Sequence, residues 1–304
     1  MQIAVIDLGT NTCNLLVAEI IGKTFKIHYQ SSQPVKLGDG AIQKNIISEE
    51  AMERAKIALL KHKEIINNFN CIEVRVIGTS AIRSAKNQSS FLSFIKENTD
   101  YVIDVISGDQ EADLIYKGVL LAFNKLNSSK LILDIGGGSN EFIICGINGI
   151  QWQKSFPTGI SRVIHSNQIS DAITSPELKA LNSYFEKEHK LILDQFPQNN
   201  IETLIGCSGA FDTIADILDE VEPGKKTRVN QLITIDEFYL VYYRLISEPK
   251  KELLKIKGMN PVRIDLIIPA IILIKQVIEK TGIKQIYQTD YALREGVLYT
   301  KMND

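Results

Sequence analysis

Cysteine is scarce in this chain, and its spacing excludes several kinds of site. The four cysteines, Cys13, Cys71, Cys145 and Cys207, lie far apart, with no CxxC pair and no histidine at metal-ligand spacing. Three of them fall in or beside apolar, strand-like stretches. This pattern argues against a disulfide framework or a zinc site and favours buried free thiols.

Long apolar runs are missing as well. The longest, LIIPAIILI at 266–274, contains Pro269 and is much shorter than the run of about 20 residues that crosses a bilayer as a helix. The N-terminus has no basic segment, and Asp7 interrupts its short apolar run. We therefore expect a cytoplasmic protein that does not bind membranes.

An excess of charge of one sign is also absent. The chain has 34 basic and 36 acidic residues, with a net charge of −2. This balance argues against a general nucleic-acid binder, so an anionic ligand would have to be held by focused charge or by backbone amides. The length of 304 residues is sufficient for two domains, each with its own core.

One pattern is present twice. The stretches AVIDLGTNTCNLLVAEI at 4–20 and LILDIGGGSNEFIICGI at 131–147 each contain an apolar strand, an Asp-x-Gly turn, a run of small or polar residues and a second apolar strand. Such internal repetition constrains the whole fold.

The elements predicted around these stretches also repeat in order. In the first half we expect strands at 2–8, 13–20 and 24–30, a helix at 49–67 capped by Ser48, a strand at 72–79, helices near 80–97, a strand at 102–107 and a helix at 110–124. In the second half we expect strands at 131–135, 141–147 and 151–156, a helix capped by Ser175, a strand at 201–207, a helix from Gly209, a helix at 235–247 with a Thr234–Glu237 capping box, a helix near 261–280, a strand at 283–289 and a closing helix at 291–302.

This order predicts a duplicated α/β fold with two domains. We expect domain I to comprise residues 1–125 plus 291–304 and domain II to comprise residues 126–290. A cleft would separate the two halves, and the two Asp-x-Gly turns would face each other across it.

Turns of this composition are suited to phosphate. Glycine allows close approach, and backbone N–H groups and hydroxyls form an anion-binding concavity. The residues expected to bind phosphate are Gly9, Thr10, Asn11 and Thr12 in the first turn and Gly136, Gly137, Gly138 and Ser139 in the second. The preceding acids, Asp7 and Asp134, would hold a divalent cation, and Glu141 could join Asp134.

Seven successive motifs resemble those of the Ppx/GppA phosphatase family, the exopolyphosphatases and guanosine pentaphosphate phosphohydrolases. They are DLGTNT, GTSAIRSAKN, ISGDQEADLIYKGV, DIGGGSNEF, SFPTGISRV, GCSGAFDTIA and YALREGVL, in the family's order from Asp7 to Leu298. The resemblance implies an actin-like, ribonuclease H-like duplicated fold. The fold alone would not decide the function, because it supports many activities.

The resemblance also implies roles for single residues. Glu111 would be the general base that activates water against a terminal phosphoryl group, and Ser80 and Arg83 would contact phosphate. Asp134 and Glu141 would be the acids associated with Mg²⁺. The remaining matches are the second-domain glycine loop of Gly206, Ser208 and Gly209, which lines the nucleotide region in related folds, and Arg162, for which a structural role is equally consistent.

The chain departs from the family pattern in several respects. Thr10 and Thr12 replace serines without losing the hydroxyl. Asn14 stands where many members carry Arg or His, and Gln110 replaces an acidic residue before Glu111. The C-terminal helical domains of long members are absent, from which we expect a preference for short polyphosphate chains or nucleotides.

The loop EPGKKTRVN at 222–230 concentrates Lys225, Lys226 and Arg228. It either holds the distal end of an anionic substrate or is a solvated loop, of which the solvated loop is preferred.

Three functional hypotheses follow. The first is a Mg²⁺-dependent phosphohydrolase that acts on inorganic polyphosphate, and the second is the same chemistry on guanosine pentaphosphate. The third is a sensor that binds polyphosphate or an alarmone without turnover. A kinase is disfavoured because no acceptor pocket is recognisable. The sequence leaves the oligomeric state open, a homodimer included.

Overall fold

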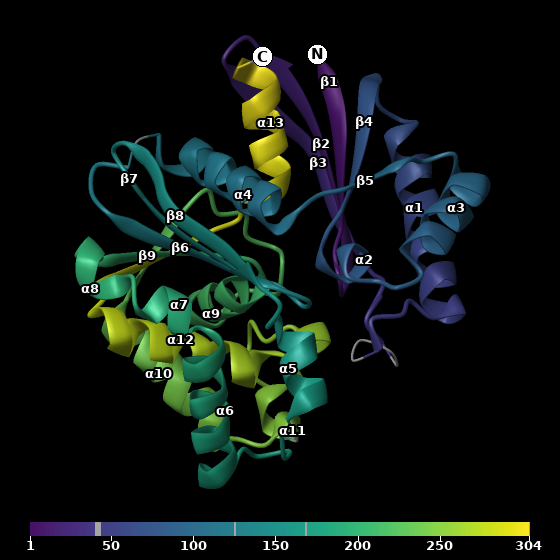
Figure 1. The fold of residues 1–304 in the computed structure, drawn as a ribbon. Coiled ribbons are helices and arrows are strands. Elements are labelled where there is room, and N and C mark those ends of the chain that lie inside the picture. The colour runs from purple at the N-terminus through teal and green to yellow at the C-terminus, as the bar shows by residue number, and fades with distance from the viewer. Residues whose placement is uncertain (40–43, 125, 168, 304) are drawn as a thin grey trace. The chain divides into compact units, whose positions relative to one another are not determined.

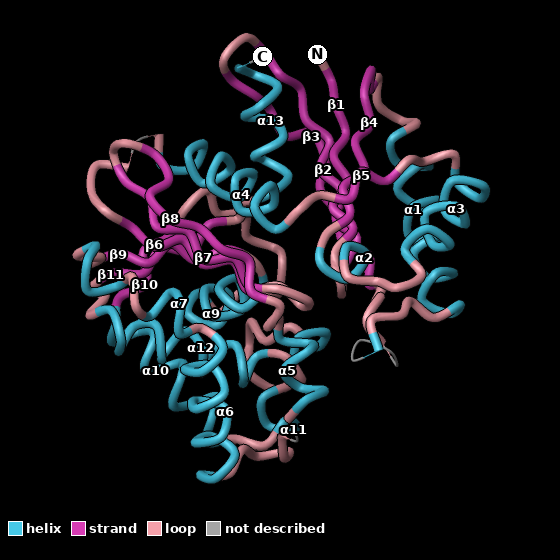
Figure 2. The backbone as a smooth tube through the Cα atoms, in the orientation of Figure 1, coloured by secondary structure: helices cyan, strands magenta, loops and turns pink. Residues whose placement is uncertain are grey.

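The computed structural model describes residues 1–39, 44–124, 126–167 and 169–303. The chain forms two compact units, each with its own sheet (Figures 1 and 2). Unit 1 consists of Met1–Leu121 and Leu293–Asp304, and unit 2 of Ala122–Ala292. No helix in the described part of the chain is both long and apolar enough to span a membrane.

Unit 1 contains a five-stranded mixed sheet in the order β3-β2-β1-β4-β5. Strand β1 is antiparallel to β2 and parallel to β4. The strands are β1 Gln2–Leu8, β2 Thr12–Ile21, β3 Thr24–Pro34, β4 Cys71–Gly78 and β5 Ile103–Val105, and the helices are α1 Glu49–Ile66, α2 Ser80–Arg83, α3 Gln88–Thr99, α4 Gly108–Phe123 and α13 Leu293–Asn303.

Alternation along β1 divides its residues between the two faces of this sheet. Ala4, Ile6 and Leu8 pack in the core with the buried residues of α1 and α3. The odd-numbered residues, including Asp7, point to the opposite face, and α13 packs against the strand. Asp7 therefore lies at the C-terminal end of a central strand, where ligands bind in open α/β sheets.

Unit 2 contains a six-stranded sheet in the order β10-β11-β9-β6-β7-β8. Its strands are β6 Lys130–Ile135, β7 Asn140–Gly146, β8 Gly149–Phe156, β9 Thr203–Cys207, β10 Gln231–Thr234 and β11 Gln285–Thr289, and its helices are α5 Ile160–Ser166, α6 Ser175–Glu188, α7 Lys190–Leu193, α8 Phe196–Asn199, α9 Gly209–Asp219, α10 Ile235–Ser247, α11 Lys250–Leu253, the 3₁₀ helix η2 Pro261–Arg263 and α12 Ile267–Thr281. Without β10, the sheet repeats the strand order and directions of unit 1. The predicted duplicated α/β fold is confirmed.

Two local predictions were incomplete or wrong. Strand β10 was not predicted, because only two of its four residues are apolar. The N-cap of α6 is Thr174 rather than Ser175. Thr174 has extended backbone, its side chain accepts a hydrogen bond from Glu177 N, and Glu177 accepts one from Thr174 N. Ser175 is therefore already the first helical residue.

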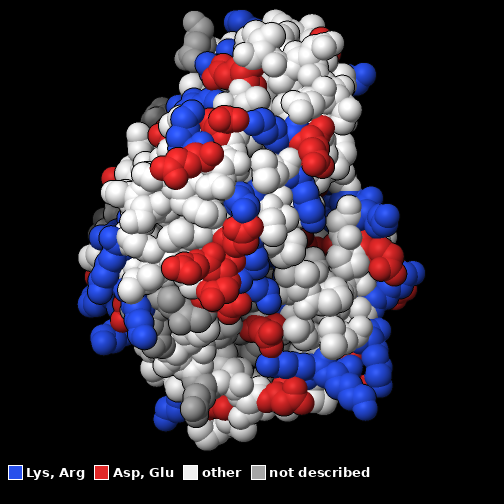
Figure 3. Space-filling model, turned by 90° about the vertical axis from the view of Figure 1, so that its right-hand side faces the viewer, with Lys and Arg blue, Asp and Glu red and all other residues white. Residues whose placement is uncertain are grey.

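The thiols and the surface charges agree with the expectations. Cys13, Cys145 and Cys207 are buried free thiols, Cys71 is partly buried, and burial raises the pKa of Cys145 to about 12. On the face drawn in Figure 3, basic and acidic side chains are intermingled, as the balanced composition predicts.

Candidate active site

The turn between β1 and β2, Gly9–Thr12, is held in place through its carbonyl groups. Gly9 N donates to Thr12 O at 2.9 Å and closes the turn. Asn11 O accepts from Val35 N and Lys36 N, and Thr10 O accepts from Leu37 N at 2.7 Å. Because these carbonyl oxygens are engaged by the segment 35–37, they do not repel an anion. We call Gly9–Thr12 the first donor turn.

The turn between β6 and β7, Gly136–Ser139, has the same construction. Gly136 N donates to Ser139 O at 3.0 Å. Gly136 O accepts from Ile160 N and Gly137 O from Ser161 N, both at 2.9 Å, and Arg162 Nε donates to Gly138 O at 3.0 Å. All four carbonyl oxygens of this second donor turn are therefore engaged. A loop whose carbonyls are engaged in this way suits a ligand that needs hydrogen-bond donors.

The hydrogen bond from Arg162 to Gly138 O supports a structural role for Arg162. The glycine that precedes its helix is also required. A Cβ on Gly159 would lie 2.3 Å from Ser139 N and 2.4 Å from Gly137 C. The start of α5, the helix that carries Arg162, is therefore packed directly against the second donor turn.

Glu111 lies in the first turns of α4 and forms an ion pair with Arg83. Arg83 Nη1 is 2.8 Å from Glu111 Oε2 and also donates to Ile106 O at 3.0 Å. The Glu111 side chain is 10% exposed, whereas that of Arg83 is 25% exposed. A buried carboxylate fixed on a helix beside a partly accessible guanidinium can orient a water and contact an anion at once.

Ser80 starts α2 directly after β4, and β4 lies beside β1. Leu8 pairs with Gly78, and Thr79 N donates to Leu8 O at 3.4 Å. Ser80 is buried. The start of the segment that carries Ser80 and Arg83 is therefore hydrogen-bonded to the last residue of β1, directly before the first donor turn.

Gln110 caps the helix that carries Glu111. Gln110 N donates to Ser107 Oγ at 3.1 Å, and Gln110 Oε1 accepts from Ser107 N at 2.8 Å. This reciprocal pair is a capping box at the N-terminus of α4. The glutamine that departs from the family pattern therefore has a structural use in this chain.

Asp7 is surrounded by polar groups of unit 1. Asn14 Nδ2 donates to Asp7 Oδ2 at 3.4 Å and to Thr12 Oγ1 at 3.2 Å, and Asn14 Oδ1 accepts from Ser32 at 2.7 Å. Burial raises the pKa of Asp7, while the Arg294 guanidinium opposes that shift. Asn14, the other residue that departs from the family pattern, therefore links the Asp7 carboxylate to Thr12 of the first donor turn.

Asp134 and Glu141 are directly opposite each other on β6 and β7, so their side chains share one face. Ser208 Oγ donates to Asp134 Oδ1 at 2.5 Å, and Ser155 Oγ donates to Glu141 Oε1 at 2.6 Å. Among the described residues there is no group of three or more His, Cys, Asp or Glu side chains placed to hold a metal. A pair of carboxylates is nevertheless consistent with Mg²⁺, which retains waters and uses one or two carboxylates together with substrate phosphates.

The glycine loop Gly206–Gly209 is tightly packed. A Cβ on Gly206 would lie 2.1 Å from the Phe211 ring, and one on Gly209 would meet the Arg263 guanidinium. Between them, Ser208 has φ 68° and ψ 177°, a region that is essentially confined to glycine and costs about 1–3 kcal/mol. Such strain, in the residue that holds Asp134, is typical of functional sites.

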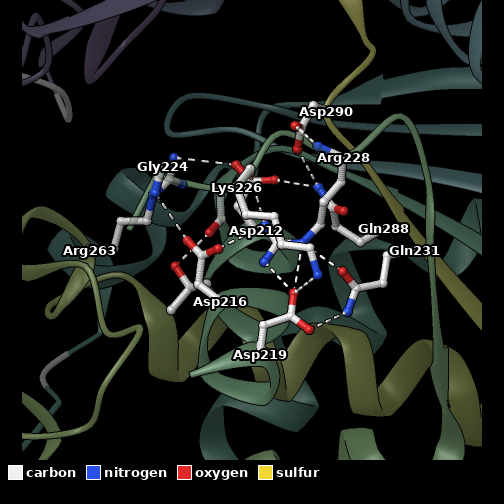
Figure 4. A network of polar contacts seen from close by, with 12 residues as sticks. Asp212, Asp216, Asp219, Gly224, Lys226, Arg228, Gln231, Arg263, Gln288 and Asp290 are labelled. Atoms are coloured by element: carbon white, nitrogen blue, oxygen red, sulfur yellow. Dashed lines mark hydrogen bonds and ion pairs between the residues drawn. The ribbon is translucent and has the colours of Figure 1, made fainter. Parts of the chain in front are cut away.

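The basic loop is largely exposed, as the preferred alternative predicted, except at Arg228. Arg228 is 4% exposed, with Nη1 2.8 Å from Asp216 Oδ1 and Nη2 2.6 Å from Asp219 Oδ2 (Figure 4). Lys226 Nζ also pairs with Asp219, at 2.6 Å. The sequence could not show this, because the acids lie on α9, several residues before the loop. Arg228 is thus unavailable to an anionic ligand.

The residues predicted for the site fall into two groups. Unit 1 contains Asp7, the first donor turn, Ser80, Arg83 and Glu111, and unit 2 contains Asp134, Glu141, the second donor turn and the Gly206–Gly209 loop. Sequence reasoning did not single out Arg294 and Glu295 of α13, although both affect Asp7 electrostatically. The signal was available, since both lie within the quoted motif YALREGVL.

Comparisons with known proteins give one consistent result. A sequence profile of the Ppx/GppA phosphatase family matches residues 16–304. A crystal structure of an exopolyphosphatase from Cytophaga hutchinsonii is 34% identical, covers 100% of this chain and 98% of its own, and has a TM-score of 0.94.

Two sequence relatives differ in how much of their length is matched. A Haemophilus influenzae protein, named provisionally as an exopolyphosphatase, is 30% identical over 98% of this chain and 91% of its own. A guanosine-5'-triphosphate,3'-diphosphate pyrophosphatase from Photobacterium profundum is 28% identical over 99% of this chain and 59% of its own. The chain therefore spans nearly all of the first relative and less than two thirds of the second.

Proposed function

Since the chain belongs to the Ppx/GppA phosphatase family, we propose that it is a phosphoanhydride hydrolase that releases the terminal phosphate of inorganic polyphosphate. The observation that carries this proposal is the buried Glu111, which is fixed on α4 and paired at 2.8 Å with Arg83. The named exopolyphosphatases among its structural and sequence relatives support this choice of substrate.

In this proposal, Glu111 orients a water molecule and accepts a proton from it as the water attacks the terminal phosphorus. Arg83 and Ser80 bind oxygens of the terminal phosphate. Each donor turn supplies N–H and hydroxyl groups to phosphate oxygens. Positioning and charge stabilisation provide most of the catalysis in phosphoryl transfer. The leaving group is the polyphosphate shortened by one unit.

Mg²⁺ is the proposed cofactor, and Asp134 and Glu141 are the residues that would hold it. A divalent cation would neutralise phosphate charge as it develops in the reaction. Asp7, in unit 1, is a further acid that would bind a divalent cation. The hydroxyls of Ser208 and Ser155 fix the carboxylates of Asp134 and Glu141.

Guanosine pentaphosphate is a second candidate substrate, because the Photobacterium profundum relative is named for that activity. Both substrates end in a phosphoanhydride, so the same groups would serve either. The third candidate is a sensor of polyphosphate or alarmone that binds without turnover. In this proposal the enzyme acts in the cytoplasm, and neither nucleic acid nor a membrane is a partner.

Phosphate release tests the proposal. Short-chain polyphosphate, long-chain polyphosphate and guanosine pentaphosphate are compared in the presence and absence of Mg²⁺. We expect Mg²⁺-dependent release from polyphosphate and a loss of about 100-fold or more in kcat for Glu111→Gln, the usual range for removal of a general base. The matched control is Glu97→Gln, which changes an exposed residue of α3 in the same unit.

The outcomes separate the candidates. Release from guanosine pentaphosphate alone would replace the first substrate with the second. Tight binding of any of the three without release would favour the sensor. Full activity of Glu111→Gln would remove Glu111 from the mechanism.

A further inference from the structure

Three polar side chains of unit 2 are buried together beside the second donor turn. Asn140, Thr158 and His189 are 0%, 2% and 1% exposed. Asn140 begins β7 directly after the turn, Thr158 precedes α5, and His189 is the C-cap residue of α6. Burying polar groups costs stability even when they are paired, and apolar side chains of similar size would avoid that cost.

Thr158 is at the centre of this group. Asn140 Nδ2 donates to Thr158 O at 2.8 Å and to Thr158 Oγ1 at 3.3 Å. The Thr158 hydroxyl is also 2.7 Å from His189 Nε2. The backbone and the side chain of Thr158 are therefore both fixed by neighbours that are distant in sequence.

Aromatic rings hold the histidine end. The Phe185 ring stacks on the imidazole with centroids 5.7 Å apart and an interplanar angle of 7°, and the Phe142 and Phe156 centroids lie 5.0 Å from it. Burial lowers the pKa of His189 to about 4. The imidazole is therefore neutral near pH 7 and does not add charge to the site.

Thr158 is connected to the second donor turn through the three residues that follow it, Gly159, Ile160 and Ser161. Gly159 packs so closely that a Cβ there would lie 2.3 Å from Ser139 N. The next two residues, Ile160 and Ser161, donate to Gly136 O and Gly137 O. Any displacement of Thr158 is therefore passed to the turn, with no flexible segment between them.

We propose that His189 and Thr158 are positioning residues, which act through residues 158–161, the start of α5 and the two residues before it, to set the geometry of the second donor turn for phosphate. This inference rests on the proposed function, because it assigns the turn a phosphate ligand. Errors of about 1 Å in the position of a reacting or binding group can cost about 100-fold in rate. A polar group at this place gives residues 158–161 one defined position.

The test uses a matched pair at one residue. Thr158→Val keeps the shape and removes the hydroxyl, whereas Thr158→Ser keeps the hydroxyl. We expect kcat/KM for polyphosphate to fall about 10- to 100-fold in Thr158→Val and to stay within about threefold of wild type in Thr158→Ser. Thr99→Val is the control, since Thr99 is buried in unit 1 and its hydroxyl also makes two hydrogen bonds.

Amide hydrogen exchange gives a readout that does not depend on activity. In Thr158→Val and in His189→Phe, the amides of Ile160 and Ser161 should exchange about tenfold or more faster than in wild type, and Thr158→Ser should restore them. Unchanged exchange of these two amides, or a Thr158→Val enzyme with normal kcat/KM well below its Tm, would overturn the inference. An inactive wild type with the expected exchange pattern would instead refute the proposed function alone.

Discussion

Arg83 Nη1 lies 2.8 Å from Glu111 Oε2 and 3.0 Å from Ile106 O. This one nitrogen therefore connects α2, which carries Arg83, with α4 and with Ile106, the residue after β5. Neither contact uses the other two guanidinium nitrogens, and the Arg83 side chain is 25% exposed. Arg83 can therefore hold the proposed base and contact a substrate oxygen with different atoms of one planar group.

Removal of Arg83 should weaken catalysis on every phosphate substrate. We expect Arg83→Ala to lower kcat/KM about 100-fold, because both the fixed position of Glu111 and a charge-assisted phosphate contact are lost. Steady-state kinetics on polyphosphate and guanosine pentaphosphate measure this. The control is Arg75→Ala, which removes an exposed ion pair with Asp104. A loss confined to one substrate would instead assign Arg83 to recognition of the part of that substrate that is not phosphate.

Gln110 should matter for stability and not for turnover. Gln110→Ala removes the hydrogen bond from Ser107 N, one half of the capping box, and should lower the free energy of unfolding by about 0.5–1.5 kcal/mol. Gln110→Glu keeps an acceptor at this position and should retain that stability. Urea unfolding measures both variants, and Ser107→Ala combined with Gln110→Ala gives the coupling. A large loss of kcat in Gln110→Glu would show that the amide has a catalytic use.

Two substitutions of Ser208 should separate its effect on stability from its effect on activity. Both Ser208→Gly and Ser208→Ala remove the hydrogen bond to Asp134, but only glycine relieves the backbone at φ 68° and ψ 177°. We expect the glycine variant to be more stable than the alanine variant by about 1–3 kcal/mol, while both lose activity together. Thermal unfolding and phosphate release measure the two effects. Equal stability of the variants would mean that this backbone is not strained.

Asp290 should make stability depend on pH in a defined direction. Burial, with a contribution from Asp212, raises the pKa of Asp290 to about 6, against the hydrogen bonds from Arg228 N and Gln288. Because the pKa in the folded state exceeds the ordinary value of 3.8, the unfolded chain loses its proton first as pH rises. Stability from this group is therefore complete below about pH 4 and declines until about pH 6.

Asp290→Asn removes this titration. The stability difference between wild type and variant should change by up to about 3 kcal/mol between pH 4 and pH 6.5, since each pKa unit corresponds to about 1.4 kcal/mol. Urea unfolding over this pH range measures it, with Asp171→Asn, at an exposed residue, as the control. A pH-independent difference would show that the neighbours of Asp290 in Figure 4 compensate for its burial.

Much of the fold was predictable because its signals are local. The apolar strands around Asp7 and Asp134, the capping box at Thr234 and the repeated order of elements each depend on residues close together in the chain. The N-cap of α6 was misplaced by one residue, because threonine and serine are adjacent and both can cap.

The sequence by itself determined the repeated Asp-x-Gly turns, the family motifs and the residue types of the candidate site, because each is encoded within a short segment. Only the tertiary structure decided which of these groups pair. It engaged the carbonyls of the donor turns with residues 35–37 and 160–162, joined Arg83 to Glu111 and buried Arg228 against α9. Each of these contacts depends on the position of a partner elsewhere in the fold, where burial and distance set the strength of a charge or hydrogen bond.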